Sequence, residues 1–200
     1  MLRRRVPHPQ PLTSRLDRLR VGLARHRART DSGEGPLIWA AVAVVLVPQP
    51  DALLLIRRAE RTGDPWSGHM ALPGGRQDPG DPDLTATAVR ETAEEVGVEL
   101  PRAALLGSLD DVVPRTPALP PIAVRPYVFA LPERPPLSLN PEVASARWVL
   151  LDHLLHPRTY HSVRIQIRGE DREFPAYQLE DAIVWGMTER VVTTLLDRLR

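Results

Sequence analysis

Apolar residues in this chain gather in short runs separated by turn-forming segments, a pattern typical of strands in a folded domain. The runs Leu37–Val47 and Ala52–Ile56 flank a turn at 48–51, so we expect a buried β-hairpin. The segment 59–83 is rich in Gly, Pro and Asp and is expected to be loop. The segment 114–141 holds nine prolines and must be partly loop, because proline cannot donate to a sheet ladder. The other predicted strands are 103–113, 122–131 and Ala146–Leu150.

Two segments place apolar residues at helical spacing. The first, Leu84–Val96, lacks glycine and proline, and Gly97 follows it as a terminator would. We expect Asp81 to cap this helix and Pro82 to occupy its first position. The second, Ala182–Leu199, is predicted as a C-terminal helix whose apolar stripe consists of Val184, Met187, Val191, Leu195 and Leu199. Strands mixed with helices at both ends predict a single domain of the α/β or α+β class.

Residues 1–35 differ from the remainder, 36–200, because they carry nine arginines against two aspartates and one glutamate. A helix start signal at Thr13 or Ser14 lies among leucines at helical spacing, which are Leu12, Leu16, Leu19 and Leu23. We expect an Arg-rich extension with a short amphipathic helix that docks on the body and keeps its arginines in water. The alternative is an arm that binds nucleic acid or another anionic ligand.

Composition narrows the class of protein. The 26 basic residues, all arginine, nearly balance 25 acidic ones, and the net charge of +1 argues against a protein that coats nucleic acid. The absence of cysteine and lysine excludes a disulfide scaffold, a thiolate site and Schiff-base chemistry. The longest apolar run has 11 residues, whereas a membrane-spanning helix needs about 20. No secretory signal follows the first arginines, so we expect a cytoplasmic protein without a membrane partner.

Three glutamates on the first predicted helix, Glu91, Glu94 and Glu95, carry the main chemical signal. Their spacing of i, i+3 and i+4 places all three carboxylates on one helix face, where like charges repel. A divalent cation such as Mg²⁺ or Mn²⁺ would relieve the repulsion, because hard cations prefer oxygen ligands. The alternative is a solvated acidic face. Arg90 is adjacent and suited to pair with a loop acid, and the pair Gly74–Gly75 lets the backbone approach a ligand closely.

The glycine pair and the helix together resemble the Nudix box, G-x5-E-x7-R-E-U-x-E-E-x-G-U, where U is a bulky aliphatic residue. The second half matches at its proper spacing through Arg90, Glu91, Glu94, Glu95, Gly97 and Val98. The first half departs from the pattern, since Asp81 stands where glutamate is expected after Gly75 and lies one residue too far from the arginine. Thr92 replaces the usual aliphatic residue. We interpret Asp81 as the loop acid that pairs with the arginine, with Asp78 and Asp83 as rivals.

The resemblance implies an α/β/α sandwich around a mixed β-sheet and hydrolysis of a nucleoside diphosphate linked to another group. It implies that Glu91, Glu94 and Glu95 bind Mg²⁺ or Mn²⁺ together with the carbonyl group of Gly75. Clustered cations would neutralise the diphosphate and activate a water molecule. The general base is left open between Glu91, Glu95 and the distal Glu142, which lies in a segment that Nudix chains often show after the box.

Two further stretches, 53–75 and 183–196, resemble the Nudix branch that contains coenzyme A pyrophosphatases. The motif before the box matches in part, because the interval from Arg57 to Gly68 is two residues longer and Leu72 replaces phenylalanine. Arginine forks suit phosphate oxygens and tryptophan can stack on adenine. The alternative roles are a solvated strand edge for the arginines and loop packing for the tryptophan. The candidate substrate contacts are Arg57, Arg58, Arg61 and Trp66.

The leading hypothesis is an enzyme that cleaves coenzyme A or an acyl-coenzyme A into 3′,5′-ADP and 4′-phosphopantetheine or its acyl form. A second hypothesis changes the substrate to ADP-ribose, a dinucleotide or a nucleoside triphosphate. A third is a non-catalytic, ligand-sensing Nudix domain, against which the retained glutamates argue. We expect a nucleotide-type small molecule as the partner, not nucleic acid, and leave monomer or homodimer open. Structural or surface roles are expected for His69, His153, His156 and His161.

Overall fold

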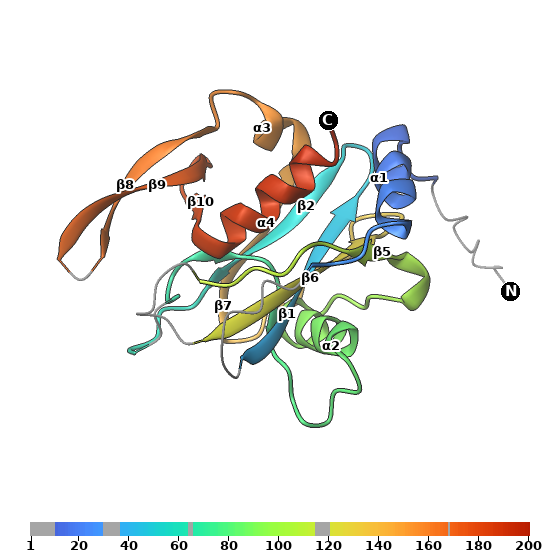
Figure 1. Cartoon of the computed structure of the whole chain (residues 1–200), viewed down its shortest axis with the longest axis horizontal. Coiled ribbons are helices and arrows are strands. Elements are labelled where there is room, and N and C mark those ends of the chain that lie inside the picture. Colours follow the sequence, from blue (N-terminus) through green and yellow to red (C-terminus); the bar gives the residue numbers. More distant parts are fainter. Residues whose placement is uncertain (1–10, 30–36, 64–65, 115–120, 168) are drawn as a thin grey trace, which may run out of the picture.

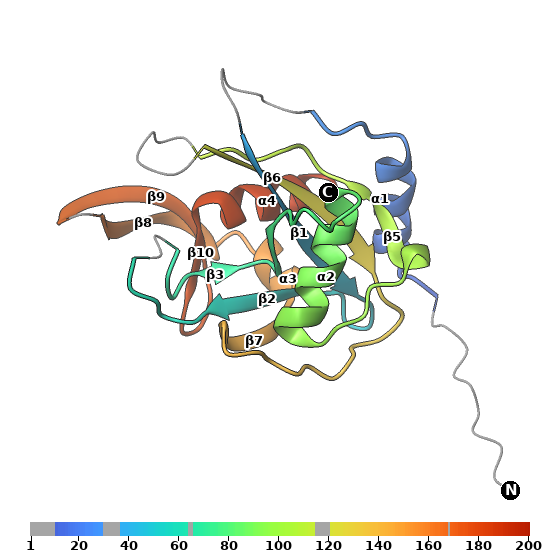
Figure 2. The same ribbon diagram turned by 90° about the horizontal axis from the view of Figure 1, so that it is seen from below.

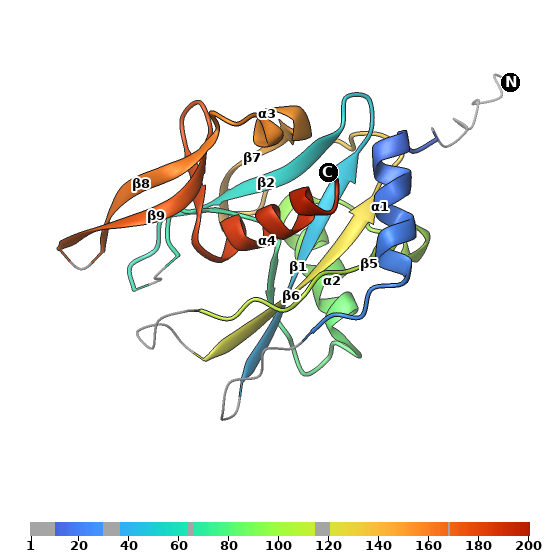
Figure 3. The same cartoon turned by 45° about the horizontal axis from the view of Figure 1, so that its top comes forward.

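A computed structural model describes residues 11–29, 37–63, 66–114, 121–167 and 169–200 of the chain. Within these residues a mixed β-sheet is covered on one face by α2 (Leu84–Val96) and on the other by α1 (Ser14–Ala24) and α4 (Gly186–Asp197). Figure 3 shows α1 and α4 in front of the sheet and α2 behind it. The expected α/β/α sandwich around a mixed sheet is confirmed. None of the helices in these ranges is long and apolar enough to cross a membrane.

The central strand, β1 (Ile38–Val47), packs against helices on both of its faces. Ala41 and Ala43 pack in the cluster that contains α2, whereas Val44 and Leu46 pack in the cluster that contains α1 and α4. Successive residues of a strand point to opposite faces. Because both faces of β1 are covered, the strand is apolar almost throughout, as the run Leu37–Val47 predicts.

The main sheet has the order β3-β2-β1-β6-β5, with β4 paired to β1 and β7 paired to β2. Only the β1–β6 pair is parallel among the named strands described here. All predicted strand segments contain a strand, but β5 is shorter than expected because the 3₁₀ turn η1 (Arg102–Ala104) precedes it. The strands beside β1 are β2 (Ala52–Arg58), β3 (Met70–Ala71), β4 (Gly74–Arg76), β5 (Leu105–Ser108), β6 (Ile122–Ala130) and β7 (Val143–Leu150).

The sheet divides next to the predicted hairpin. β1 pairs with β2 only beside the turn, where Leu46 lies opposite Leu53 and Val47 lies opposite Ala52. Beyond these pairs β3 takes up the free edge of β2, and β4 takes up the free edge of β1. The consecutive strands β3 and β4 therefore belong to different halves of the sheet. The expected loop at 59–83 contains both of them, because each short segment finds an open strand edge to pair with.

Helix α2 spans Leu84–Val96 as predicted, but its cap is Asp83, whose side chain accepts a 2.8 Å hydrogen bond from a backbone N–H of the first turn. The expected cap by Asp81 is wrong because that side chain binds an arginine instead, and Pro82 therefore precedes the helix. Gly97 ends the helix with a left-handed φ of 68°, as a glycine terminator should.

The C-terminal helix begins later than predicted. Ile183–Trp185 forms β10, which pairs with β9 (Glu170–Gln178), and α4 starts only at Gly186. β9 also pairs with β8 (Tyr160–Ile167), so these three strands form a second sheet. The short helix α3 (Leu151–Leu155) precedes this sheet in the chain. The sequence analysis did not identify the β8–β9 hairpin, because most of its residues remain exposed and its apolar pattern is weak.

Helix α1 is anchored by the leucines that the spacing indicates. Leu16, Leu19 and Leu23 are buried in the same core cluster as α4 and the strands. Thr13 caps the helix, and a Cβ on Gly107 of β5 would lie only 3.0 Å from the Cβ of Leu23. The helix therefore shares the core of the remainder of the chain, and the division at residue 35 stays a prediction.

Replacing Leu19 by alanine should lower the free energy of unfolding by about 2–5 kcal/mol, because it removes buried surface and leaves a cavity. Val21 on the same helix is 50% exposed, so Val21→Ala is the matched control and should change stability by less than about 0.5 kcal/mol. Urea denaturation followed by circular dichroism measures both variants. Equal small effects would show that α1 is not anchored in the core.

Candidate functional site

The candidate site lies where the sheet divides, around Gly74–Gly75 at the start of β4. Gly74 has a φ of 150°, and a Cβ there would lie 2.2 Å from the carbonyl oxygen of Ala41. A Cβ on Gly75 would lie 2.4 Å from Oε1 of Glu91. Gly74 therefore requires glycine, and the backbone of Gly75 lies directly against a carboxylate of α2.

Glu95 is the most enclosed of the three helix glutamates, with 3% of its surface exposed. Its Oε2 accepts a 2.9 Å hydrogen bond from the backbone N–H of Gly74. Burial raises the pKa of Glu95 to about 7, opposed by that hydrogen bond and by the charge of Arg58, and Glu91 raises it further. Without a cation this carboxyl group titrates near neutral pH, and a bound cation would favour its charged form.

The guanidinium of Arg90 joins the loop before α2 to the helix carboxylates. Its Nε and Nη2 donate to the two carboxylate oxygens of Asp81 at 3.0 and 2.9 Å. Its Nη1 donates to Glu91 at 2.9 Å and to Glu94 at 3.1 Å. The hydrogen bonds from Arg90 hold the pKa of Asp81 well below its usual range, so both partners are charged at neutral pH. The interpretation of Asp81 as the partner of this arginine is confirmed.

The loop accommodates its additional residue in a turn. Oδ1 of Asp78 accepts a 2.9 Å hydrogen bond from the N–H two residues later, and Oδ2 of Asp81 accepts one of 2.9 Å from the N–H of Asp78. Oδ2 of Asp81 also accepts a 2.9 Å hydrogen bond from the hydroxyl of Thr87 on α2. These bonds bring a short aspartate side chain up to Arg90, and the rival Asp78 serves the turn.

The helix carboxylates have different partners in this structure. Glu91 and Glu94 accept hydrogen bonds from Arg90, whereas Glu95 accepts one from Gly74. Among the described residues no three acidic or histidine side chains are arranged as a metal-binding group. The donor set still fits a hard divalent cation, because carboxylate oxygens on one helix face adjoin the backbone of Gly75. A cation at this place would compete with Arg90 for two of the carboxylates.

The distal candidate Glu142 lies close to these carboxylates in space. Its carbonyl oxygen accepts a 2.8 Å hydrogen bond from the N–H of Ala59, and its Oε1 accepts one of 2.9 Å from Nη2 of Arg61. Burial is the main cause of the raised pKa of Glu91 and of Glu95, and the negative charge of Glu142 adds to both. The fold thus brings the start of β7 to the site.

The three arginines among the candidate substrate contacts differ in burial and in their partners. Arg58 is half-buried, and its positive charge acts on Glu95. Arg61 is bound to Glu142 and is therefore also next to the carboxylates. Arg57 is exposed, and its Nε donates to the carbonyl oxygen of Gly68 at 3.3 Å, which ties the ends of the loop together.

The aromatic candidate Trp66 is half-buried in the same loop, where its carbonyl oxygen accepts a 3.2 Å hydrogen bond from the N–H of His69. The ring of His69 in turn meets the ring of Trp185 edge-on, with centroids 4.8 Å apart. This packing agrees with the structural role expected for His69.

Arg125, which no sequence motif predicted, lies in the same row of the sheet as Gly75. Gly75 is opposite Ala41 on β1, and Ala41 is opposite Arg125 on β6. Arg125 donates two 2.8 Å hydrogen bonds to Asp111, and its guanidinium lies 5.4 Å from the centre of the Trp39 ring. No local motif signals this cluster, because its members come from three separate segments of the chain.

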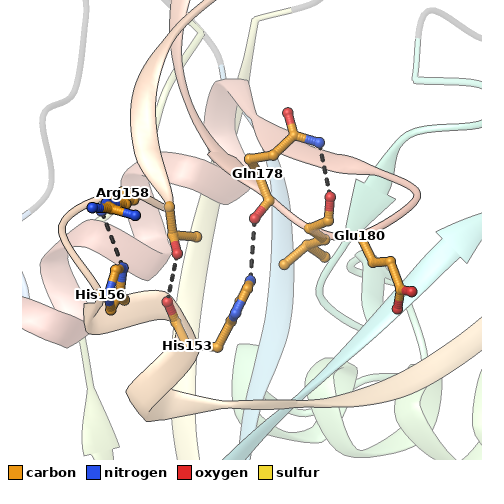
Figure 4. A pocket seen from close by; sticks show the side chains of 7 residues that line it. His153, His156, Arg158, Gln178 and Glu180 are labelled. Carbon is orange, nitrogen blue, oxygen red and sulfur yellow. Dashed lines mark hydrogen bonds between the residues drawn. The ribbon is translucent and has the colours of Figure 1, made fainter.

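Two further histidines, His153 and His156, line a pocket made of other residues. Figure 4 shows an open pocket in which a ring nitrogen of His153 lies 3.2 Å from the carbonyl oxygen of Gln178, and Nδ1 of His156 accepts a 3.3 Å hydrogen bond from the N–H of Arg158. The contact of His153 joins α3 to β9, and the contact of His156 lies within the segment after α3. The pocket is lined by His153, His156, Arg158, Thr159, Gln178, Leu179 and Glu180.

Known proteins resemble this chain in sequence and in fold. The NUDIX domain family model matches residues 37–168. The chain is 32% identical over 162 residues to an uncharacterized Nudix hydrolase, NudL, of Photorhabdus laumondii, and the match covers 80% of this chain and 84% of that protein.

Two solved structures share the fold at low identity. A MutT/nudix family protein from Enterococcus faecalis matches with a TM-score of 0.60 and 17% identity, over 92% of this chain and 69% of its own. The NUDIX domain of Shewanella oneidensis NrtR, crystallised with ADP ribose, matches with a TM-score of 0.50 and 22% identity, over 66% of this chain and 83% of its own. These likenesses show the fold, while the family model and the NudL relative extend the match to the glutamate helix, and so the chain belongs to the Nudix hydrolase family.

Proposed function

We propose that this Nudix hydrolase is a Mg²⁺- or Mn²⁺-dependent pyrophosphohydrolase that cleaves the diphosphate of coenzyme A or an acyl-coenzyme A. The products are 3′,5′-ADP and 4′-phosphopantetheine or its acyl form. The observation that carries the proposal is the set of Glu91, Glu94 and Glu95 on α2 beside the backbone of Gly75. Clustered carboxylates next to a glycine backbone suit the cations that assist diphosphate hydrolysis.

In this proposal the three glutamates hold the cation together with the carbonyl oxygen of Gly75, since hard oxygen donors are the ligands that Mg²⁺ and Mn²⁺ prefer. When bound, the cation neutralises charge on the diphosphate and lowers the pKa of the attacking water. Arg90 is a positioning residue, because its bonds to Asp81, Glu91 and Glu94 hold the loop and the helix face in one arrangement.

Three carboxylates remain candidates for the base that takes the proton from the water. Burial raises the pKa of Glu91 and of Glu95, and a carboxylate tuned toward neutral pH makes an effective base. Glu142 is about half exposed and paired with Arg61, whose side chain is likewise about half exposed. A substrate phosphate that draws Arg61 away would release Glu142 to act as the base.

The loop before β3 supplies the proposed recognition of coenzyme A. Arg58 and Arg61 lie beside the carboxylates, Arg57 at the end of β2 is bonded to Gly68, and coenzyme A carries a 3′-phosphate in addition to its diphosphate. Trp66 in the same loop offers an aromatic face for adenine. These contacts would distinguish coenzyme A from nucleotides that lack the additional phosphate.

A second candidate keeps the chemistry and changes the substrate to ADP-ribose, a dinucleotide or a nucleoside triphosphate. It is favoured by the engagement of Arg57 and Arg61 with groups of the protein itself, Gly68 and Glu142. The departures of this loop from the coenzyme A motif point the same way. The likeness to the NrtR domain adds only the fold to this candidate.

Replacing Glu95 by glutamine should lower kcat at least about a hundredfold and weaken cation binding, because one charged ligand is lost; a hundredfold is about 2.7 kcal/mol. In cation-free protein at pH 8 the variant should be more stable by about 1–3 kcal/mol, since the buried carboxylate no longer ionises. The raised pKa, about 7, means that the wild-type carboxyl group costs nothing near pH 4 and destabilises as the pH rises through 7. Kinetics and denaturation measured at pH 5 and pH 8 test both statements.

The control is Glu99→Gln, at an exposed position just after the same helix. It should leave turnover, cation binding and the pH dependence of stability unchanged. Wild-type turnover of the Glu95→Gln variant at saturating Mg²⁺ would refute the assignment of this glutamate as a ligand.

Coenzyme A should be hydrolysed with a kcat/KM about 10–150-fold higher than that of dephospho-coenzyme A, because one charge-assisted contact is worth about 1.5–3 kcal/mol. A panel with Mg²⁺ and Mn²⁺, products separated by chromatography, measures this ratio beside ADP-ribose, dinucleotides and nucleoside triphosphates. Arg57, Arg58 and Arg61 are each replaced by glutamine in a separate variant. The variant that loses the contact with the 3′-phosphate should no longer prefer coenzyme A over dephospho-coenzyme A. Equal values for both coenzymes would remove the 3′-phosphate from recognition, and the highest value for ADP-ribose would select the second candidate.

Replacing Asp81 by asparagine should lower the free energy of unfolding at pH 7 by about 1–3 kcal/mol, because a charge-assisted bond to Arg90 is lost. The carboxylate with a lowered pKa stabilises the fold above pH 4 and loses this effect as the pH falls, so the difference between the proteins should shrink in acid. Cation affinity should also fall, since Arg90 is then free to bind Glu91 and Glu94 more closely. Asp78→Asn, which keeps its turn acceptor, is the control and should match wild type.

A further inference from the structure

The β8–β9 hairpin reaches beyond the layers of the fold. β8 and β9 pair along their whole length, from Tyr160 opposite Tyr177 to Ile167 opposite Glu170. The inner end meets the body, where Tyr177 is buried and β9 pairs with β10. Figures 1 and 2 show the outer part extending away from the sandwich. Two strands alone are marginally stable in water, so an extended hairpin indicates a further partner.

The outer strand of this hairpin has an open edge. The order of the second sheet is β10-β9-β8, so one row of backbone N–H and C=O groups on β8 has no strand partner among the described residues. Proteins usually protect such an edge with proline, lysine, an inward-pointing charge, a bulge or a covering element. β8 contains no proline or acidic residue and pairs with β9 without a register shift, and the exposed Arg164 is its single arginine. By contrast, the edge strand β5 of the main sheet is covered by α1.

The two faces of β8 differ in character. Val163, Ile165 and Ile167 share one face and are half-exposed, whereas Arg164 and Gln166 on the other face are exposed. Three partly buried β-branched apolar residues are side chains that favour strand pairing. The edge therefore offers both backbone groups and an apolar row to a partner strand.

The apolar face is continuous with the packed part of the protein. Phe174, opposite Val163 on β9, contacts the ring of Trp185 with centroids 5.2 Å apart. Trp185 in turn contacts His69, at the end of the loop that carries Trp66 and Arg61. A partner on this face would extend an existing core and would fix the sheet against which the candidate substrate loop packs.

We propose that β8 pairs antiparallel with β8 of a second copy of this chain, across a two-fold axis at Ile165. In this register Ile165 lies opposite its own copy and Val163 lies opposite Ile167, so apolar side chains meet on one face. Arg164 then lies opposite Gln166, whereas a register centred on Arg164 would oppose two like charges. A two-fold axis satisfies both open edges in one closed dimer.

The absence of cysteine from the chain allows a direct test by disulfide cross-linking. Opposite residues of an antiparallel pair have Cα atoms about 4.5–5.5 Å apart, within the range of about 4.4–6.8 Å that a disulfide spans. The oxidised Ile165→Cys variant of the full chain should therefore run mainly as a covalent dimer on a non-reducing gel. The matched control is Arg172→Cys, opposite Ile165 on β9. Its copies would lie three strand spacings, about 14 Å, apart and should not cross-link.

Light scattering on the wild-type protein provides an independent measurement. We expect twice the chain mass of 22.3 kDa. Ile165→Lys opposes two like charges and should raise the dimer Kd at least tenfold, whereas Val21→Lys, at a position 50% exposed on α1, should leave it unchanged.

A wild-type monomer at all concentrations up to about 100 μM would overturn the proposal. So would a dimer in which the Ile165→Cys variant fails to cross-link, or in which the Arg172→Cys variant cross-links equally, because the dimer would then use another surface. None of these outcomes depends on the substrate of the enzyme.

Discussion

Arg90 donates hydrogen bonds to three carboxylates, and this single guanidinium offsets charge that α2 does not balance by itself. Asp81 in the loop before α2 orients the guanidinium, and Glu91 and Glu94 on the helix accept its other hydrogen bonds. Without this contact, like charges one turn apart would repel, and the loop before α2 would lose a tie to the helix that adds to the bond between Asp81 and Thr87. The position of the loop and the fit of a cation both depend on it.

The division of the sheet determines where the carboxylates of α2 lie relative to the backbone. β1 and β2 separate after two residue pairs, and the chain crosses from β3 to β4 at Gly74 and Gly75. Gly74 has no room for a Cβ and donates its N–H to Glu95, and the backbone of Gly75 lies directly against Glu91. The enclosure that follows raises the pKa of Glu95 to about 7, mainly through burial. One backbone crossing therefore sets both the geometry and the electrostatics of the site.

Residues distant in the sequence complete the site through the strands on either side. Glu142 lies just before β7 and pairs with Arg61 of the loop between β2 and β3. Arg125 lies on β6, in the same row of the sheet as Gly75. The second sheet adds a different element. Its strand β10 packs on the loop through Trp185 and His69, and its outer strand β8 is left with an open edge.

The sequence by itself determined the elements whose periodicity is local and strong. These are the hairpin at 37–56, the amphipathic helices, the leucines of α1 and the glutamate spacing of α2, because burial and like-charge contacts along one helix follow from neighbours three or four residues apart. Only the tertiary structure decided which acid meets Arg90, where α4 begins and that Glu142 lies near Glu95. Asp81 and Asp83 are alike in local sequence, and their roles separate only when the loop turns at Asp78. Strand edges, turns and cross-strand partners are non-local contacts, and no local pattern records them.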